Sequence, residues 1–266
     1  MKTAIIIPAR YASTRFPGKP LVKIGGETML ARVAAVAQEA AQKIKNVTIA
    51  VATEDGRIEE HCGQIGIPCV MTSSQCRTGS DRVLEAATQL AGDFDFVVGL
   101  QGDAPFTPVE APVRMLETYM GDPNIEVVTP IVQLRWSELD ALRESKKVTP
   151  FSGTTCVTDV KGRALWFSKN ILPAIRKEDA LRRSEFSPVF QHIGLYGFRF
   201  DVLKKFVTLP EGKYEELEGL EQLRLLENGI SVQTVTLNVD AGMAQAGIDS
   251  PEDVERAERL LAAARR

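Results

Sequence analysis

Short apolar runs alternate with helical patterns over the first half of the chain, and this alternation constrains the fold most strongly. The runs expected as strands are rich in β-branched and small apolar residues and cover 4–8, 47–53, 68–71, 96–100 and 126–132. Helices are expected between them, over 28–41, 55–63, 80–91 and 108–119. Continuous apolar strands separated by helices are typical of a parallel sheet covered on both faces. The sequence therefore predicts an α/β fold with a mostly parallel sheet flanked by helices.

The pattern changes after about residue 149. A hairpin is expected over 154–157 and 164–167, followed by a single strand over 190–200. We interpret residues of about 150–200 as a smaller β-rich lobe inserted within a single domain that spans 1–266.

The last part of the chain returns to alternating elements. We expect a helix around 215–228, a strand at 230–237 and a final helix that follows Ser250 and Pro251. Serine is a favoured N-cap and proline a favoured first helical residue, so the final helix is expected to begin there.

The charge balance excludes several classes of partner. Lys and Arg total 32, Asp and Glu total 35, and the formal net charge is -3. This balance gives no global basic field for nucleic acid or an anionic membrane surface. No apolar run approaches a membrane-spanning length, and no apolar signal core precedes the first strand. We therefore expect a cytoplasmic protein with no nucleic-acid partner and no membrane insertion.

A basic loop follows the first expected strand. Arg10, Arg15 and Lys19 alternate there with small residues, and Pro17 and Pro20 restrict the backbone. Ligands of parallel sheets bind at the carboxyl ends of the strands. Fixed cations and backbone N–H groups at such a place suit a triphosphate or a leaving pyrophosphate, although a solvated surface turn explains the same composition.

Two aspartates are candidate metal ligands. Asp103 lies on a short turn directly after the expected strand at 96–100, and Asp249 precedes the final helix. Carboxylate oxygens are the ligands that Mg²⁺ prefers. Each aspartate alone also fits a turn or a helix cap, so the hypothesis of a magnesium site depends on the pair.

Polar residues near the end of the chain suggest a ligand pocket. On a single strand, the two-residue period places His192, Gly194 and Tyr196 on one face, which fits either a pocket floor or a half-exposed strand. Glu221 and Gln222 flank an apolar helical stripe, where a solvated surface position is the ordinary interpretation.

Taken in order, these segments resemble the 3-deoxy-manno-octulosonate (Kdo) cytidylyltransferases, the CMP-Kdo synthetase family. The resemblance covers nearly the whole chain. Its motifs are 7–21, 78–82, 101–105, 164–168, 192–197, 220–224 and 248–253. It implies a Rossmann-like nucleotidyltransferase sheet, a homodimer that uses the β-rich lobe, and a place in lipopolysaccharide biosynthesis.

The resemblance also implies a role for each matching residue. Residues at nucleotide-binding positions are Pro8, Ala9, Arg10, Ser13, Arg15, Lys19, Thr78, Gly79, Ser80, Arg82 and Gln101. Residues at positions that contact the acidic sugar are His192, Tyr196, Glu221 and Gln222. Asp103 and Asp249 match the two Mg²⁺ carboxylates, and together with Arg10 and Lys19 they are expected to act in catalysis.

The expected reaction transfers CMP from CTP to the anomeric hydroxyl of Kdo, with pyrophosphate as the leaving group. Mg²⁺ is expected to activate the hydroxyl and to neutralise phosphate charge, while the basic loop stabilises pyrophosphate.

Four positions depart from the family pattern and leave the acceptor open. This chain has Ala104 where the family usually has Glu, Thr155 where it has Lys, Cys76 where it has His, and Lys169 where it has Arg. The alternative within catalysis is CMP transfer to another acidic acceptor, such as an amino-substituted ulosonate or a small phosphonate. A regulatory protein that binds the nucleotide without turnover is the alternative from another class.

Overall fold

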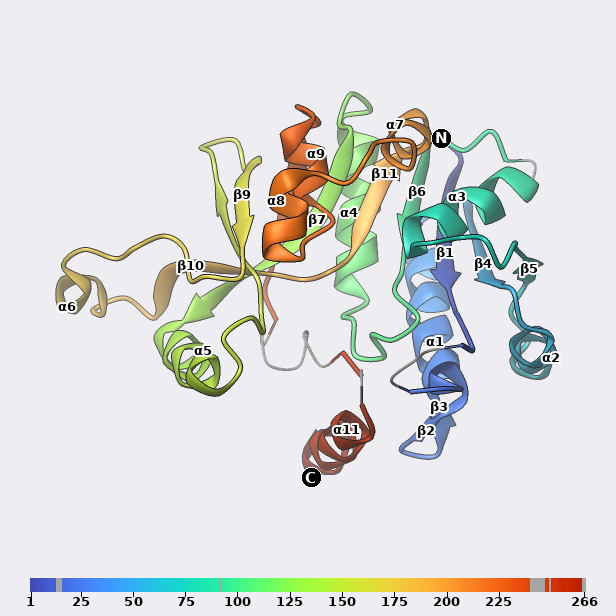
Figure 1. Cartoon of the computed structure of the whole chain (residues 1–266), viewed down its shortest axis with the longest axis horizontal. Coiled ribbons are helices and arrows are strands. Elements are labelled where there is room, and N and C mark those ends of the chain that lie inside the picture. Colours follow the sequence, from blue (N-terminus) through green and yellow to red (C-terminus); the bar gives the residue numbers. More distant parts are fainter. Residues whose placement is uncertain (13–15, 91, 240–246, 249, 265–266) are drawn as a thin grey trace.

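The computed structural model describes residues 1–12, 16–90, 92–239, 247–248 and 250–264. Within these ranges, ten strands form one large sheet (Figure 1). They are β1 (Thr3–Pro8), β4 (Val47–Thr53), β5 (Cys69–Met71), β6 (Phe96–Gly99), β7 (Val127–Arg135), β8 (Thr155–Thr158), β9 (Ala164–Ser168), β10 (Phe186–His192), β11 (Tyr196–Arg199) and β12 (Val232–Leu237). The strand order is β5-β4-β1-β6-β11-β7-β10-β8-β9, and β12 also pairs with β7.

Most strands of the sheet run in the same direction. β5, β4, β1 and β6 pair in parallel. β11 is antiparallel to both β6 and β7, so β7 keeps the direction of β6, and β12 pairs in parallel with β7. The mostly parallel sheet expected from the sequence is therefore confirmed. β8, β9 and β10 extend it with antiparallel pairings.

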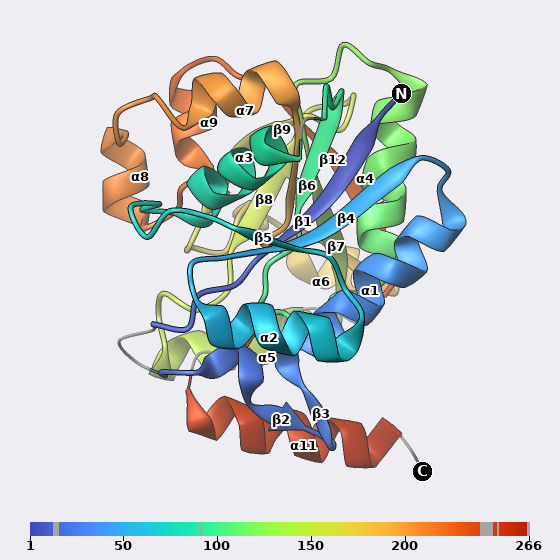
Figure 2. The same cartoon turned by 90° about the vertical axis from the view of Figure 1, so that its right-hand side faces the viewer.

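Helices cover both faces of the sheet (Figure 2). On one face lie α1 (Met29–Lys43), α2 (Gly56–Ile65), α4 (Glu110–Gly121) and α5 (Trp136–Val148). On the other lie α3 (Gly79–Gln89), α7 (Phe200–Phe206) and α9 (Leu223–Glu227), with α8 (Lys213–Glu218) beside α9. Strand β1 serves both cores, because Ile5 and Ile7 face one and Ala4 and Ile6 the other, all fully buried.

A small unit lies beyond the carboxyl ends of the parallel strands, at the bottom of Figure 1, and its two strands form a second sheet. It contains the 3₁₀ helix η1 (Lys19–Leu21), the hairpin of β2 (Lys23–Ile24) and β3 (Glu27–Thr28), and α11 (Pro251–Ala264). Ile24 and Ala257 share a small apolar cluster, and the Gly25 N–H donates to Glu258 Oε1 at 2.8 Å. The final helix therefore packs beside the segment that follows β1.

The expected start of the final helix is confirmed. Pro251 is the first residue of α11. The Ser250 N–H donates to Asp253 Oδ2 at 3.0 Å, and the Asp253 N–H donates back to Ser250 Oγ at 3.4 Å. These reciprocal bonds are those of a capping box.

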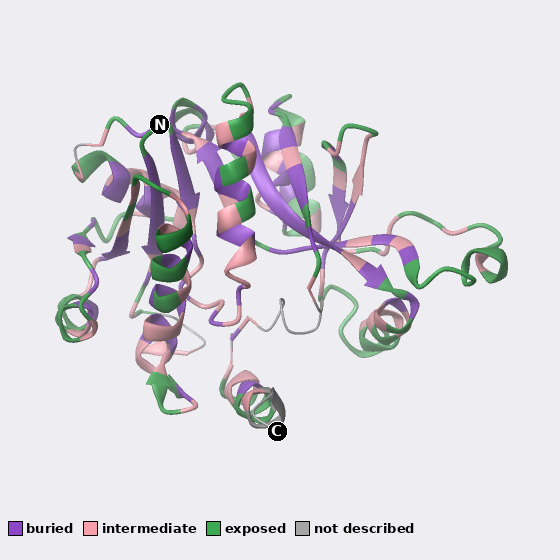
Figure 3. Cartoon of the chain, turned by 180° about the vertical axis from the view of Figure 1, so that it is seen from behind, coloured by how far each residue is buried: buried purple, intermediate pink, exposed green. Residues whose placement is uncertain are grey.

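One segment extends away from the sheet. Figure 1 shows α6 (Glu178–Leu181) at the end of a long arm, and Figure 3 shows that much of this arm is exposed. The guanidinium of Arg143 on α5 forms two hydrogen bonds with the Glu178 carboxylate, at 2.9 and 2.7 Å. No helix in the described ranges is long and apolar enough to cross a membrane.

The prediction of a single strand over 190–200 is wrong. The chain forms β10 and β11 instead, and residues 193–195 lie between them. The Leu195 N–H donates to the Ile193 carbonyl at 2.7 Å, so the chain turns there. The turn moves the chain from pairing with β7 and β8 to a place between β6 and β7.

The prediction of a single helix around 215–228 is also wrong. Helix α8 ends at Glu218 and is capped by Gly219, whose φ of 61° lies in the left-handed region that favours glycine. Helix α9 begins at Leu223, so Leu220, Glu221 and Gln222 form the link between the two helices.

A buried ion pair holds this helix pair together. Arg224 Nε and Nη2 lie 2.7 and 2.5 Å from the two carboxylate oxygens of Glu215. The Arg224 side chain is 12% exposed and that of Glu215 is 7% exposed.

We predict that Arg224→Met lowers the free energy of unfolding by about 3 kcal/mol, because it leaves Glu215 buried without its counter-charge. The matched control is Lys43→Met, which removes an exposed pair with Glu39 and is expected to cost less than about 0.5 kcal/mol. Urea denaturation measures both. Equal losses in the two variants would contradict a buried pair at Arg224.

Candidate active site

The turns after β1 and β6 are in direct backbone contact. The Leu100 N–H donates to the Ile6 carbonyl at 2.9 Å, which continues the pairing of the two strands. A Cβ atom on Gly102 would lie 2.6 Å from the Pro8 carbonyl oxygen. Only glycine fits this approach, so Gly102 is what lets the two loops share one crevice.

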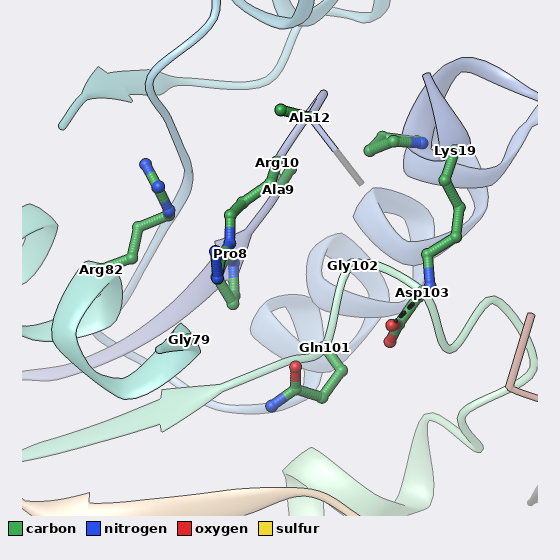
Figure 4. Close-up of a pocket in the computed structure, with 11 residues that line it drawn as sticks. Pro8, Ala9, Arg10, Ala12, Lys19, Gly79, Arg82, Gln101, Gly102 and Asp103 are labelled. Carbon is green, nitrogen blue, oxygen red and sulfur yellow. Dashed lines mark hydrogen bonds and ion pairs between the residues drawn. The ribbon is translucent and has the colours of Figure 1, made fainter. Parts of the chain in front are cut away.

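A cavity of about 380 Å³ opens between these turns and the start of α3 (Figure 4). Polar and basic side chains and small residues line it. They are Pro8, Ala9, Arg10, Ala12, Lys19, Pro20, Gly79, Arg82, Gln101, Gly102 and Asp103. The structure thus brings together seven of the residues at predicted nucleotide-binding positions, Pro8, Ala9, Arg10, Lys19, Gly79, Arg82 and Gln101.

Lys19 and Asp103 face each other across this cavity. Lys19 Nζ lies 2.9 Å from Asp103 Oδ2, and Figure 4 shows the two side chains meeting from opposite loops. The Lys19 side chain is 13% exposed, whereas that of Asp103 is 42% exposed. The carboxylate therefore keeps solvent-accessible surface beside the cation.

The amino end of α3 forms one wall of the cavity. Asp81 Oδ2 accepts the N–H groups of Arg77 and Thr78, and the Thr78 hydroxyl accepts the Asp81 N–H. Arg10 Nη2 donates to the Arg77 carbonyl at 2.9 Å, which ties the basic loop to this wall. Thr78 acts as the helix cap, and neither it nor Ser80 lines the cavity.

Arg82 occupies a different position from the other cations. Its side chain is 1% exposed, and Nη2 lies 2.7 Å from Glu54 Oε2. In Figure 4 its guanidinium points away from Asp103. Its charge is therefore already balanced within the protein, and Arg82 helps to form the cavity wall.

A second cavity, of about 440 Å³, adjoins the first and shares Gln101 and Asp103 with it. Its wall combines residues from β10, β11, the turn between them and the link between α8 and α9 with residues of four further segments, at 101–107, 153–154, 169 and 247. The residues are Gln101, Asp103, Ala104, Thr107, Gly153, Thr154, Lys169, His192, Ile193, Gly194, Leu195, Tyr196, Leu220, Glu221, Gln222 and Gly247. All four residues at predicted sugar-binding positions, His192, Tyr196, Glu221 and Gln222, lie here.

The local structure that places these four residues differs from the expected one. The His192 and Tyr196 rings lie 5.4 Å apart, yet they come from two strands on either side of the 193–195 turn. Glu221 and Gln222 reach the cavity from the break between α8 and α9 and not from a helix edge. Both deviations from regular structure therefore contribute directly to this cavity.

His192 is buried and neutral. The Thr129 hydroxyl donates to the Leu195 carbonyl at 2.8 Å and so must accept its 2.8 Å bond from His192 Nε2–H. This assigns the Nε2-protonated tautomer. Burial, with a smaller effect of the Lys169 charge, lowers the pKa of His192 to about 3.

Two polar atoms of this cavity lack a hydrogen-bond partner among the described residues. They are the Tyr196 hydroxyl and Glu221 Oε1, both buried. Burial is the main cause that raises the pKa of Tyr196 and also that of Glu221. Because buried polar groups are normally paired, these atoms indicate a polar ligand or water at this place.

Lys169 is a cavity residue that the sequence did not identify as functional. It is half-buried, and desolvation lowers the pKa of its ammonium, partly opposed by the Glu218 charge. It supplies a cation to the second cavity. The available signal was the family resemblance, in which this position usually carries Arg.

Three predicted site residues, Ser13, Arg15 and Asp249, lie outside the described residues. The neighbour of Asp249 is described, and the Ile248 N–H donates to the Asp103 carbonyl at 3.1 Å.

A mostly parallel α/β sheet with a basic cavity at its strand ends, adjoining a polar second cavity, is the arrangement expected of a nucleotidyltransferase. The family comparison agrees, since a model described as cytidylyltransferase matches residues 4–234. The chain is therefore a cytidylyltransferase enzyme.

The similar proteins give the family within this class. The chain is 41% identical to a 3-deoxy-manno-octulosonate cytidylyltransferase of Maricaulis maris, over 99% of this chain and 98% of that protein. It is 38% identical to the enzyme of the same name from Bacteroides thetaiotaomicron, over 98% of both chains. A solved CMP:2-keto-3-deoxy-manno-octonic acid synthetase, complexed with CTP, matches with a TM-score of 0.82 and 30% identity, over 99% of this chain and all of that one. The chain belongs to the 3-deoxy-manno-octulosonate cytidylyltransferase family.

The buried neutral histidine predicts a pH dependence of stability. The unfolded chain binds a proton on His192 below about pH 6.5, whereas the folded chain does not until about pH 3, so stability falls as the pH drops through this window. Between pH 7 and pH 5 we expect His192 to account for a loss of about 2 kcal/mol in the free energy of unfolding. Urea denaturation of the natural protein and of His192→Asn at both pH values measures it. An equal loss in the two proteins would show that His192 is not held neutral.

Proposed function

We propose that the protein transfers CMP from CTP to the anomeric hydroxyl of Kdo and releases pyrophosphate. The observation that carries this proposal is the pair of adjoining cavities, one basic and one polar, that share Gln101 and Asp103. A reaction between a nucleoside triphosphate and a polar acid needs such a junction, where the two reacting groups meet. The names of the relatives and the CTP complex of the similar structure support the choice of substrates.

In the proposed reaction the first cavity holds the CTP phosphates. Arg10 and Lys19 supply positive charge, and Gly79 brings the amino end of α3, the positive end of its helix dipole, to the same cavity. The acceptor oxygen forms a bond to the α-phosphorus, and the bond from that phosphorus to the bridging oxygen breaks, with its electron pair leaving on pyrophosphate. The hydroxyl proton passes to solvent water. Preorganised cations stabilise the charge that develops on the leaving pyrophosphate.

The donor set fits Mg²⁺. Asp103 offers a hard oxygen ligand with solvent-accessible surface beside the phosphate cavity. Within the described ranges no cluster of three or more His, Cys, Asp or Glu side chains is present, and Mg²⁺ commonly needs only one or two carboxylates in addition to substrate phosphates. We propose Asp103 and Asp249 as those carboxylates. Bound Mg²⁺ supplies Lewis-acid stabilisation of the phosphate charge and lowers the pKa of the acceptor hydroxyl.

The second cavity would hold the acidic sugar. The Lys169 ammonium suits the sugar carboxylate, because a partly desolvated cation attracts an anion more strongly than an exposed one. The buried Tyr196 hydroxyl and Glu221 Oε1 would find their partners in sugar hydroxyls. His192, fixed as the Nε2-protonated tautomer, and Gln222 complete the polar wall.

A different acidic acceptor is the second candidate. Two of the four departures from the family pattern, Ala104 and Lys169, line the second cavity. An alanine in place of a glutamate removes negative charge and leaves more room. This observation favours testing amino-substituted ulosonates and small phosphonates beside Kdo.

The first experiment incubates the protein with CTP, Mg²⁺ and each acceptor and identifies products by mass spectrometry. We expect CMP-Kdo and pyrophosphate. Turnover of another acid without Kdo would replace the acceptor, and the absence of CMP transfer to any acid would overturn the proposed function.

The second experiment tests Asp103. We expect Asp103→Asn to lower kcat by roughly 100-fold, because it removes a charge from the reacting centre. The matched control is Asp93→Asn, since Asp93 is exposed in the turn before β6 and should change kcat less than about twofold. Near-normal pyrophosphate release by Asp103→Asn would contradict its role.

We further propose that the protein is a homodimer that acts in the cytoplasm and supplies lipopolysaccharide biosynthesis. The family resemblance supports all three. The dimer is also supported by apolar side chains exposed between 150 and 200, such as Phe151 at 78% and Leu165 at 59%. Light scattering after gel filtration should give near twice the 29.2 kDa of one chain. A mass near that of one chain would contradict the dimer.

A further inference from the structure

The ammonium of Lys146 lies among backbone carbonyls of two separate segments. Lys146 belongs to the last turn of α5 and is half-buried. Its Nζ lies 2.5 Å from the Ser152 carbonyl, 3.1 Å from that of Gly153 and 2.5 Å from that of Lys169. The Pro150 carbonyl lies at 3.4 Å. One side chain therefore connects the loop at 150–153 with the end of β9.

Both segments that Lys146 connects line the second cavity. Gly153 and Thr154 contribute from the loop, and Lys169 contributes from the end of β9, whereas Lys146 itself is not among the lining residues. Gly153 has a φ of 67°, and a Cβ there would lie 3.1 Å from both Gln191 Nε2 and Leu142 Cδ1. The loop thus has a defined, tightly packed conformation for the ammonium to fix.

A second tie joins the same two parts of the chain. The Thr155 hydroxyl donates to the Asn170 carbonyl at 2.6 Å and accepts the Leu172 N–H at 3.0 Å. These bonds hold the segment beyond Lys169 against β8, but they do not involve the loop at 150–153. Lys146 is the side chain that hydrogen-bonds both to that loop and to the Lys169 carbonyl.

The position of Lys146 also places a second positive charge behind Lys169. Desolvation, and then repulsion from Lys169, lower the pKa of Lys146, so the two ammonium groups are close enough to interact. Carbonyl dipoles compensate the Lys146 charge, and its three N–H donors are satisfied by main-chain oxygens. The arrangement favours an anion on the cavity side of Lys169.

We propose that Lys146 is a positioning residue of the acceptor site, which fixes the loop at 150–153 against Lys169 and so sets the affinity for the acidic acceptor. It acts through main-chain atoms of Ser152, Gly153 and Lys169 and does not contact the acceptor. This inference rests on the proposed CMP transfer, and it deepens that function by assigning how one wall of the acceptor cavity is held.

The test compares Lys146→Met with Lys147→Met. Lys147 is the next residue, its side chain is 68% exposed, and it pairs with Glu144. With CTP and Kdo, we expect Lys146→Met to raise the KM for Kdo at least 10-fold, to change kcat less than threefold, and to leave the Kd of CTP within twofold. Lys147→Met should leave all three unchanged, and Lys146→Arg, which keeps charge and donors, should recover most of the affinity.

A KM for Kdo within twofold of the natural value in Lys146→Met would overturn the proposal, as would an equal effect of Lys147→Met. Unchanged CTP binding shows that the variant is folded. If Lys146→Met fails to bind CTP, Lys146→Gln, which keeps a hydrogen-bond donor, takes its place under the same criteria.

A measurement without an acceptor separates this inference from the proposed function. Hydrogen exchange followed by mass spectrometry should show faster amide exchange at 150–154 and 168–170 in Lys146→Met than in Lys147→Met. If the natural protein uses another acid, the kinetic test is run with that acid. If it transfers CMP to none, the proposed function fails, and equal exchange in the two variants would overturn the positioning role independently.

Discussion

The ion pair between Lys19 and Asp103 joins the two loops on which the whole site depends. Parallel pairing of β1 and β6 places their carboxyl ends side by side, and Gly102 allows the two turns to touch. The 2.9 Å contact then spans the space between the turns. In this position the two side chains can exchange their contact with each other for contacts with ligands. The Lys19 ammonium can bind a phosphate, and the Asp103 carboxylate can bind a metal ion.

The second cavity arises from interruptions of regular structure. The turn at 193–195 separates β10 from β11 and allows His192 and Tyr196 to approach from two strands. Gly219 caps the end of α8, and Glu221, in the link that follows, lines the same cavity. The first cavity, in contrast, uses the regular ends of parallel strands. One chain thus combines a first cavity set by its sheet topology with a second cavity set by local breaks.

Much of the fold followed from the sequence because apolar periodicity reports burial directly. β4 begins and ends where expected, and the cap at Ser250 was evident from its side-chain chemistry. The prediction of one strand over 190–200 was wrong because all of these residues favour extended structure. The turn that divides β10 from β11 depends on the strands with which each of them pairs. The prediction of one helix over 215–228 was wrong because the apolar residues recur at helical spacing along the whole segment. The single Gly219 that caps α8 does not change that pattern.

The candidate site followed from the sequence in part. Arg10, Lys19, Gln101 and Asp103 follow strand ends, so a parallel sheet predicts their meeting. Lys169 and Lys146 could not be found in this way, because their positions depend on antiparallel pairing and on main-chain carbonyls that no residue pattern encodes.

Calorimetric titration of CTP tests whether the strand-end cations bind this nucleotide. The comparison uses the natural protein, Lys19→Met and Lys23→Met, since Lys23 is exposed on β2 nearby. We expect Lys19→Met to weaken CTP binding at least 10-fold while Lys23→Met binds CTP as the natural protein does. Equal binding by all three proteins would contradict the assignment of the first cavity to the nucleotide phosphates.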